Sequence, residues 1–462
     1  MKTLTGLISQ IIPLNAEGGA QSLRLRVQHG SFLTMGGFGA GQVLRLGSNL
    51  ILTRLVAPEA FGLMAVAVSI NIWAIMLTDI GIGSSVIRSK NSDDPEFLRT
   101  AWTMKILRNA LIWLLILLAA GAVYWLAELN TFQADSIYAN SMLPWVMMGT
   151  GAQVMLGAFS SMNLGMAQRK LALGRVIGLE IGTQVLAMIV TISFAASGYG
   201  VWALVIGMLV STSVSSIASH FIFPGPSMRL MLRRDYFFEI FNFGKWLIIA
   251  SFFGFLVNRG DQILFGGYMD SNSFSLYAIA AMWVTAAAMT MQTLISRIFF
   301  PAFSEIIRER PHALNNAYRK SRLLIDAASV IVAFGAFFLA EPAFALLYPD
   351  NYAGVGYYVK LLSPFLLLTP FRLINTLVLA GGDSKNFTGV TVLAGLSMLV
   401  LTPIAFSTFG EKAAIVCFSV IELVALPIIW RIGAKRIDID PKVEARALAA
   451  IALILALIFW MD

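Results

Sequence analysis

The stretch GDQILFGGYMDSNSFSLYAIA (residues 260–280) can be placed over GSNLILTRLVAPEAFGLMAVA (residues 47–67) without a gap. Each stretch runs from the end of an apolar segment, through a short turn, into the next apolar segment. The identical positions are Gly47 and Gly260, Phe61 and Phe274, Leu63 and Leu276, Ala65 and Ala278, and Ala67 and Ala280. A match at this distance predicts two halves built from the same arrangement of segments.

The composition around these stretches excludes an ordinary soluble protein. Of the 462 residues, 58% are hydrophobic and only 13% are charged, with a mean hydropathy of +0.77. Soluble proteins are nearer half apolar and a quarter charged. The apolar runs are too long and continuous for barrel strands, in which apolar and polar residues alternate. We therefore predict an all-α polytopic membrane protein.

A helix that spans a membrane needs about 20 mostly apolar residues. Thirteen segments meet this requirement: 31–53, 60–82, 103–126, 141–163, 176–196, 200–222, 243–265, 275–300, 323–346, 360–380, 387–408, 413–430 and 445–460. The repeat aligns the first segment with the seventh. Six spans separate them, an even number, so both halves have the same orientation. The sequence thus predicts two six-helix lobes related by a parallel repeat, plus a C-terminal helix.

The basic residues predict the orientation of these spans, because cytoplasmic loops carry an excess of Lys and Arg. With the N-terminus in the cytoplasm, 26 of the 33 basic residues fall in cytoplasmic segments, 3 fall outside and 4 lie within spans. The net charge of +8 then indicates loops that face anionic lipid rather than nucleic acid. For residues 1–30 we favour a cytoplasmic tail lying on the membrane surface over a cleaved signal peptide.

The predicted organisation follows from the spans and the charges. It comprises a tail (1–30), an N-lobe (31–222), a cytoplasmic linker (223–242), a C-lobe (243–430) and a basic loop with the last helix (431–462).

One span carries an unusual polar sector. Asn258, Arg259, Asp261 and Gln262 lie within the seventh span, and at about 100° per residue they occupy one side of a helix. Arg259 and Asp261 are two residues apart, so they point to opposite edges of that sector and do not pair well with each other. The sector favours a helix that lines a wet cavity, and the alternative is a static pair with another helix.

Other charges lie inside the predicted spans. Arg45 occupies span 1 near the position equivalent to Arg259, and repeat symmetry predicts that the two lie on opposite sides of a central cleft. Arg372, in span 10, lines a cavity or forms an ion pair. Arg297 lies near the end of span 8, where its long side chain reaches the membrane surface easily.

Three acids are candidates for coupling to a proton or a sodium ion: Asp261, Glu422 and Asp79. For Asp79, which ends span 2, a helix cap or a pair at the interface is an equally simple reading.

Neither composition nor motifs indicate an enzyme or a cofactor. The three histidines and the single Cys417 have no metal-ligand spacing. The sequence contains no nucleophile-elbow motif and no phosphate-binding glycine loop. We expect no enzyme activity, no cofactor, no metal and no nucleic acid partner.

Three stretches are similar to the Wzx-type polysaccharide flippases of the MOP superfamily, which also contains the MATE exporters. They are TRLVAPEAFGLMAVA (53–67), DIGIGSSVIRSKN (79–91) and SLYAIAAMWVTAAAMTMQTLISRIFFPAFSEI (275–306). The similarity extends from about residue 30 to residue 430. It differs from the superfamily in one respect, since twelve or fourteen spans are usual there and the count here is thirteen.

The resemblance implies a multi-pass protein of the bacterial inner membrane with a central, often cationic cavity that opens alternately to each side. It implies transport of an undecaprenyl-pyrophosphate-linked oligosaccharide to the outer leaflet. Arg45, Arg259 and Arg372 are then expected near the pyrophosphate, Asn258, Asp261 and Gln262 near the sugar, and Arg297 as a further cavity residue. It also implies partners among membrane lipids and polysaccharide polymerase or chain-length proteins.

Competing readings make different demands on the sequence. A MATE-like, ion-coupled exporter of cationic compounds needs acids facing its substrate, whereas four charges within the spans here are arginines. A glycan polymerase needs a large external loop, and the chain has none. A scaffold without transport activity predicts that Arg259→Ala is harmless.

Overall fold

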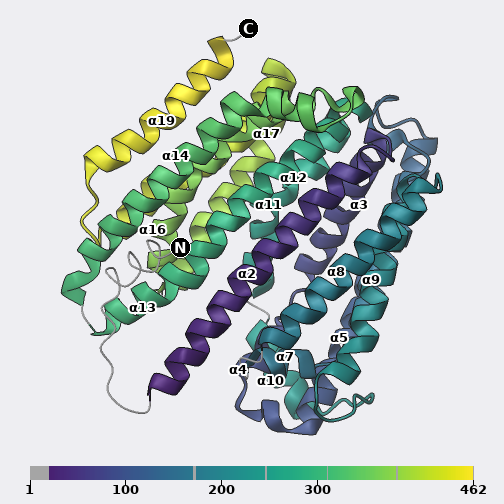
Figure 1. Cartoon of the computed structure of the whole chain (residues 1–462), viewed down its shortest axis with the longest axis vertical. Helices are drawn as coiled ribbons and strands as arrows, with labels where there is room; N and C mark the ends of the chain where they lie inside the picture. Colours follow the sequence, from purple (N-terminus) through teal and green to yellow (C-terminus); the bar gives the residue numbers. More distant parts are fainter. Residues whose placement is uncertain (1–19, 170–172, 245–246, 310, 381–382, 461–462) are drawn as a thin grey trace. The chain divides into compact units, whose positions relative to one another are not determined.

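The computed structural model describes residues 20–169, 173–244, 247–309, 311–380 and 383–460 (Figure 1). Within these ranges the chain is helical, and the only bridge between extended residues joins Ser136 to Asp270. The predicted fold class, an all-α polytopic membrane protein, is confirmed.

The helices of the first half are α2 (Ala20–Leu52), α3 (Pro58–Leu77), α4 (Ile82–Arg88), α5 (Pro95–Glu128), α6 (Leu143–Ala158), α7 (Asn163–Arg169), α8 (Leu173–Ala196), α9 (Val201–Ile222), α10 (Arg234–Gly244) and α11 (Leu247–Tyr268). Those of the second half are α12 (Ser271–Leu294), α13 (Phe300–Glu309), α14 (Leu314–Leu347), α15 (Val355–Leu362), α16 (Thr369–Ala380), α17 (Ser384–Val420), α18 (Leu426–Gly433) and α19 (Pro441–Trp460). The 3-10 segments are η1 (Lys90–Asp93), η2 (Ile137–Ala139), η4 (Pro311–Ala313), η5 (Asp350–Tyr352), η6 (Ser363–Leu368) and η7 (Ile421–Ala425), and η3 (Ile295–Phe299) is a π-helical turn.

Each of the thirteen predicted spans falls on helical segments. Among the described residues, nine helical stretches are long and apolar enough to cross a membrane. The predicted spans on α2, α6 and α11 are not among the nine, and two others share the single stretch Lys385–Gly433. A count of thirteen is compatible with this arrangement and stays a prediction.

Local sequence explains where several helices begin and break. The Asp94 side chain accepts a hydrogen bond from the Glu96 amide and is followed by Pro95, so it caps the start of α5. Gly410 interrupts α17 with a φ of 82°, a left-handed conformation that glycine adopts without steric cost. This break separates the predicted spans 387–408 and 413–430.

Internal contacts divide the described chain into two compact units. The N-terminal unit contains residues 26–279 and 347–352, and the C-terminal unit contains residues 280–346 and 353–460 together with residues 20–25. In the N-terminal unit α3 packs on α5, α6 and α11, and α8 runs beside α9 (Figure 1). The lobes predicted as residues 31–222 and 243–430 stay a prediction, and residues 1–19 of the predicted tail lie outside the described residues.

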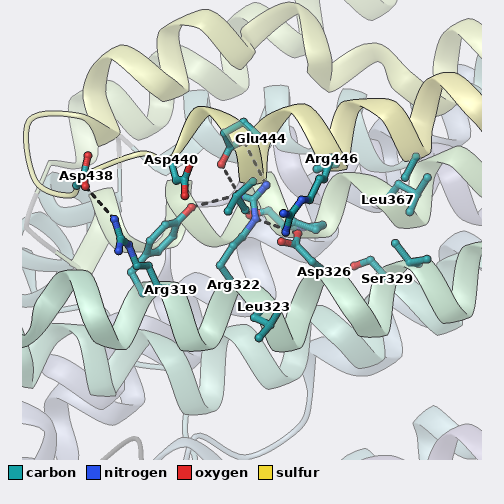
Figure 2. A pocket seen from close by; sticks show the side chains of 16 residues that line it. Arg319, Arg322, Leu323, Asp326, Ser329, Leu367, Asp438, Asp440, Glu444 and Arg446 are labelled. Atoms are coloured by element: carbon teal, nitrogen blue, oxygen red, sulfur yellow. Dashed lines mark hydrogen bonds and ion pairs between the residues drawn. The ribbon is translucent and has the colours of Figure 1, made fainter.

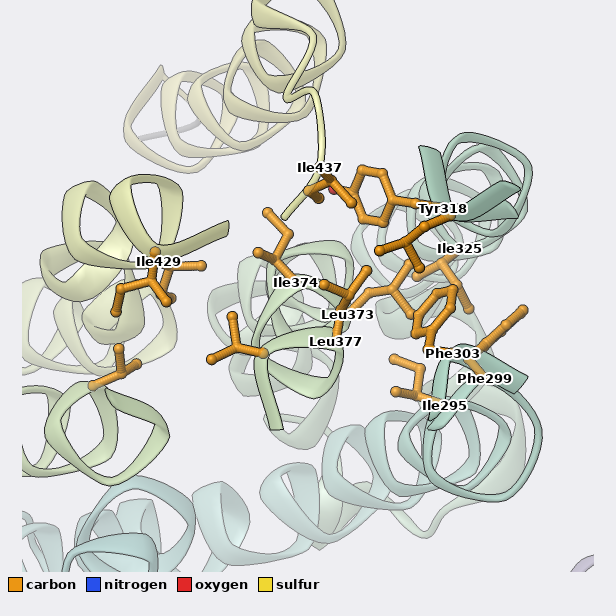
Figure 3. Packing of buried hydrophobic residues seen from close by; sticks show 14 of the residues in the cluster. Ile295, Phe299, Phe303, Tyr318, Ile325, Leu373, Ile374, Leu377, Ile429 and Ile437 are labelled. Carbon is orange, nitrogen blue, oxygen red and sulfur yellow. The ribbon is translucent and has the colours of Figure 1, made fainter. Parts of the chain in front are cut away.

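The C-terminal unit is held by an apolar core drawn from several helices (Figure 3). The labelled side chains come from η3, α13, α14, α16, α18 and the loop after α18. They are Ile295, Phe299, Phe303, Tyr318, Ile325, Leu373, Ile374, Leu377, Ile429 and Ile437. This packing fixes α14 and α16, which carry the charged side chains described below.

A glycine sets the distance between α14 and α15 in the same unit. A Cβ atom at Gly356 would lie 2.6 Å from Glu341 Cα and 2.9 Å from its amide nitrogen. Backbone atoms cannot rotate away, so Gly356→Ala must push the helices apart. We expect a loss of about 1–3 kcal/mol in unfolding free energy, measured by thermal unfolding in detergent. The matched control is Gly335→Ala on α14, where a Cβ meets nothing within 4 Å; an equal loss in both variants would contradict this account.

Candidate functional site

Two arginines of the N-terminal unit lie on helices of the apolar region. Arg45 on α2 and Arg259 on α11 are both half-buried, and their charges interact electrostatically. Neither guanidinium has a hydrogen bond or an ion pair with any residue in the described ranges, and Arg45 Nε is buried without an acceptor. The placement of the two on opposite sides of a central cleft, as repeat symmetry predicts, stays a prediction.

Such a pair is unfavourable without an anion. Two like charges repel more strongly where water does not screen them, and a buried N–H without an acceptor adds a further cost. Both costs fall when a group with several negative oxygens binds between the guanidiniums. Each guanidinium presents a planar fork of donors that matches phosphate or carboxylate oxygens in pairs. Arg45 and Arg259 thus carry the donor groups that an anion would need, and Asp261 places one negative charge within reach of Arg259.

Asp261 stands next to this pair but is enclosed by protein. Its side chain is 3% exposed. One carboxylate oxygen accepts hydrogen bonds from the Tyr277 hydroxyl on α12 and from Gln262 Nε2, the latter at 3.1 Å. The other oxygen, Oδ1, and Gln262 Oε1 are buried with no donor among the described residues. Arg259 attracts the carboxylate charge.

The residues of the predicted polar sector of α11 therefore differ in their exposure to solvent. Asn258 is exposed, and its Nδ2 donates to the Gly254 carbonyl over 2.7 Å. Asp261 and Gln262 point into the protein. Direct contact of these two side chains with a sugar stays a prediction, and Asn258 is the more accessible of the three.

Arg372 and Glu422 form an ion pair in the C-terminal unit. Arg372 Nε lies 3.0 Å from Glu422 Oε2 and Nη2 lies 2.5 Å from Oε1, so both oxygens are bound. The guanidinium carbon also lies 4.5 Å from the centre of the Phe365 ring. The sequence left two alternatives for Arg372, a cavity lining and an ion pair, and this structure has the ion pair. Its partner, Glu422, is one of the three acids predicted as candidates for ion coupling.

Asp79 lies in the turn that follows α3 and faces a cation. Its Oδ1 accepts from the Gly81 amide at 3.0 Å and lies 3.9 Å from Arg108 Nη2. Arg108 also donates to the carbonyls of Thr78 and Ile75 at 2.7 and 2.8 Å. Of the two simple interpretations of Asp79, this geometry has the pair, and the hydrogen bond to Gly81 stabilises the turn rather than a helix end. Arg297 lies on η3, and its side chain lies outside the described residues.

A third charged cluster was missed by the sequence analysis (Figure 2). Arg322 on α14 is only 1% exposed. It contacts Asp326 at 2.9 Å, Glu444 on α19 at 3.1 Å, the Tyr318 hydroxyl at 3.2 Å and the Pro370 carbonyl at 3.1 Å. The i,i+4 spacing of Arg322 and Asp326 at the start of an apolar run was the available signal. No feature of the sequence indicated that Glu444, more than 100 residues away, joins this cluster.

Metal chemistry finds no support in this part of the chain. Among the described residues that were searched, no three His, Cys, Asp or Glu side chains come together in a way that could hold a metal ion.

Comparison with known proteins places the chain in a context of polysaccharide synthesis. The sequence profile of the family described as polysaccharide biosynthesis protein matches residues 51–356. The succinoglycan biosynthesis transport protein ExoT of Rhizobium meliloti (strain 1021) is 22% identical over 320 residues. This match covers 66% of the present chain and 58% of that protein, so the chain spans little more than half of its relative's length.

Solved structures share the fold at low sequence identity. An inward-facing multidrug resistance MATE family transporter of the MOP superfamily aligns with a TM-score of 0.65 and 15% identity, over 86% of this chain and 94% of that one. The lipid II flippase MurJ, in an inward closed conformation, also gives 0.65, with 14% identity over 93% and 91%. A MOP superfamily transporter from Pyrococcus furiosus gives 0.58, with 16% identity over 92% and 98%.

The two kinds of arginine predict different effects on stability. Arg372→Ala leaves the partly buried Glu422 without its partner, and we expect a loss of about 1–3 kcal/mol in unfolding free energy. Arg259→Ala removes the repulsion with Arg45 together with the attraction to the Asp261 carboxylate, so we expect a smaller loss than for Arg372→Ala. Thermal unfolding of the purified protein in detergent measures both. Restoration of stability in the double variant Arg372→Ala/Glu422→Gln is the control, and equal losses in the two single variants would contradict the assignment.

Proposed function

The chain belongs to the polysaccharide biosynthesis protein family, and from this premise we propose that it is a flippase for a lipid-linked oligosaccharide. The resemblance to polysaccharide exporters of the MOP superfamily, predicted from sequence, is confirmed by the family match and the shared fold. The similarity to a succinoglycan transport protein supports a polysaccharide precursor as the substrate. The same fold in a lipid II flippase supports passage of a lipid-linked sugar.

The observation that carries this proposal is the pair Arg45 and Arg259. A polyprenyl diphosphate has two adjacent phosphate groups. Two guanidiniums whose charges interact, and which make no hydrogen bond or ion pair with a described residue, are complementary to it. A cationic drug would be repelled by the same pair, so the MATE-like alternative is disfavoured. The substrate we propose is an undecaprenyl-diphosphate-linked oligosaccharide, with Asn258 near the sugar.

The transport cycle we propose uses this site alternately from each side of the membrane. The diphosphate binds between the guanidiniums, the sugar lies beside Asn258, and the prenyl tail stays in lipid. Arg372 can contribute only if its pair with Glu422 opens, so we give it a secondary role. Among the predicted coupling acids, Asp261 keeps one buried oxygen without a donor in the described chain, and a proton is the simplest ligand for it.

Location and partners follow from this function. We propose the bacterial inner membrane with the N-terminus in the cytoplasm, because 26 of the 33 basic residues then face inward. Delivery of repeat units to the outer leaflet also calls for a polymerase and chain-length proteins acting on the other side.

The test is the distribution of the lipid-linked intermediate between leaflets in a deletion strain. We expect the intermediate to accumulate on the cytoplasmic side, the wild-type gene to clear it, and Arg259→Ala to slow clearance at least about 100-fold because a charge-assisted pair of hydrogen bonds is lost. Arg259→Lys keeps the charge but not the fork, so an intermediate rate is expected.

Expression level and folding need a matched control. Arg54→Ala removes an exposed arginine of the same unit that lies outside the predicted spans, and it should clear the intermediate like wild type. Clearance by Arg259→Ala at the wild-type rate would refute the arginine site, and absence of any accumulation in the deletion strain would refute the substrate class.

A further inference from the structure

A pocket of about 320 Å³ lies beside the buried Arg322 cluster in the C-terminal unit, between α14, α16 and the start of α19 (Figure 2). This volume is within the range of small-molecule sites. The pocket is distinct from the arginine pair of the N-terminal unit and has no role in the proposed transport step. It therefore requires its own explanation.

The charges of the lining gather at one end, where α14 and α19 begin. They belong to Arg319, Arg322, Asp326, Asp438, Asp440, Glu444 and Arg446. Beyond Asp326 on α14 and Arg446 on α19 the lining is mostly apolar, with Val330, Ala447 and Ala450, and Leu367 of η6 adds to it. Both α14 and α19 are apolar enough to span a membrane. A charged end followed by apolar walls, on helices that enter a bilayer, is complementary to the head and upper chains of a membrane lipid.

The pairing of these charges selects the class of lipid. Arg319 binds Asp438 at 2.9 Å, and Arg322 is shared by two carboxylates. This leaves Arg446, which has no hydrogen bond or ion pair with a described residue, and Asp440, whose carboxylate accepts only the Lys442 amide. One unpaired group of each sign remains. Four carboxylates against three guanidiniums disfavour a purely anionic head.

A buried hydroxyl supplies an independent sign of a ligand. Ser329 on α14 is 0% exposed, lines the pocket, and its Oγ has no partner among the described residues. Buried hydroxyls are nearly always hydrogen-bonded in folded proteins. Ser329 lies three residues beyond Asp326, about 4.5 Å further along the helix axis. An acceptor held there, deeper than the charged end, would complete its bonding.

We propose that this pocket binds one molecule of an aminophospholipid, a lipid with a phosphate and a primary ammonium in its head. Its phosphate binds Arg446, its ammonium binds Asp440, and a glycerol ester carbonyl accepts from Ser329. The acyl chains leave along Val330 and Ala450 into the bilayer. The bound lipid thereby ties α19 to α14, next to the Arg322–Glu444 contact.

Purified, delipidated full-length protein is the material for the test. Native mass spectrometry would measure binding of phosphatidylethanolamine, phosphatidylglycerol, a polyprenyl phosphate and water-soluble glycerophosphoethanolamine. We expect one tightly bound phosphatidylethanolamine. The soluble head should bind at least about tenfold more weakly, because it lacks the chains that cover the apolar walls.

Variants test each predicted contact. Arg446→Ala and Asp440→Asn should each weaken phosphatidylethanolamine binding about tenfold, since each removes a charged contact. The matched control is Lys442→Ala on α19, an exposed cation outside the pocket lining, which should bind like wild type. Tighter binding of phosphatidylglycerol or of the polyprenyl phosphate, or no effect of Asp440→Asn, would overturn the proposal.

Ser329→Ala separates a ligand contact from a structural role. The hydroxyl has no protein partner, so its removal should not lower the unfolding midpoint of the delipidated protein. With phosphatidylethanolamine present, the same variant should bind the lipid about fivefold more weakly and gain less thermal stability. A lower midpoint without lipid, combined with unchanged lipid binding, would show that Ser329 serves the fold alone.

Discussion

The constraint on which this structure depends is the absence of water around charges inside the apolar region. A charge there must have an opposite charge, a set of hydrogen bonds or a bound ligand, because bulk solvent is not available to stabilise it. The C-terminal unit meets the constraint within the protein, through Arg372 with Glu422 and Arg322 with its two carboxylates. In the N-terminal unit, Arg45 and Arg259 make no hydrogen bond or ion pair with a described residue, and the nearest opposite charge that acts on Arg259 is that of Asp261.

This contrast gives the two units different tasks. Paired charges hold helices at fixed positions, as Arg322 does where α14, α16 and α19 meet. Unpaired cations in a protein of the polysaccharide biosynthesis family are suited to the diphosphate of a lipid carrier. Asp261 combines both situations. Its carboxylate accepts hydrogen bonds from Tyr277 and Gln262, and it also interacts with the charge of Arg259. A diphosphate bound to Arg259 would compete for the same positive charge.

Sequence reasoning located the helices because hydrophobic length and glycine breaks are local properties, as at Gly410. It also identified Arg45, Arg259, Arg372 and Glu422 as charged residues within predicted spans, where each must have a partner or a ligand. It could not tell that the last two bind each other, since their helices are joined only by tertiary packing. Nor could it show that Asp261 is buried, because helical periodicity gives the direction of a side chain but not what covers it. Arg322 escaped notice because basic residues at the start of a span are usually read as loop charges.

The most direct measurement of the central claim is lipid affinity in a double-mutant cycle on Arg45 and Arg259. The purified protein, Arg45→Ala, Arg259→Ala and the double variant would be titrated with undecaprenyl diphosphate and with undecaprenyl monophosphate. We predict about a tenfold preference of the wild type for the diphosphate, lost in each single variant with no further loss in the double one, because both arginines hold one ligand group. Equal affinity for the two lipids in the wild type, or losses that simply add, would contradict a shared diphosphate site.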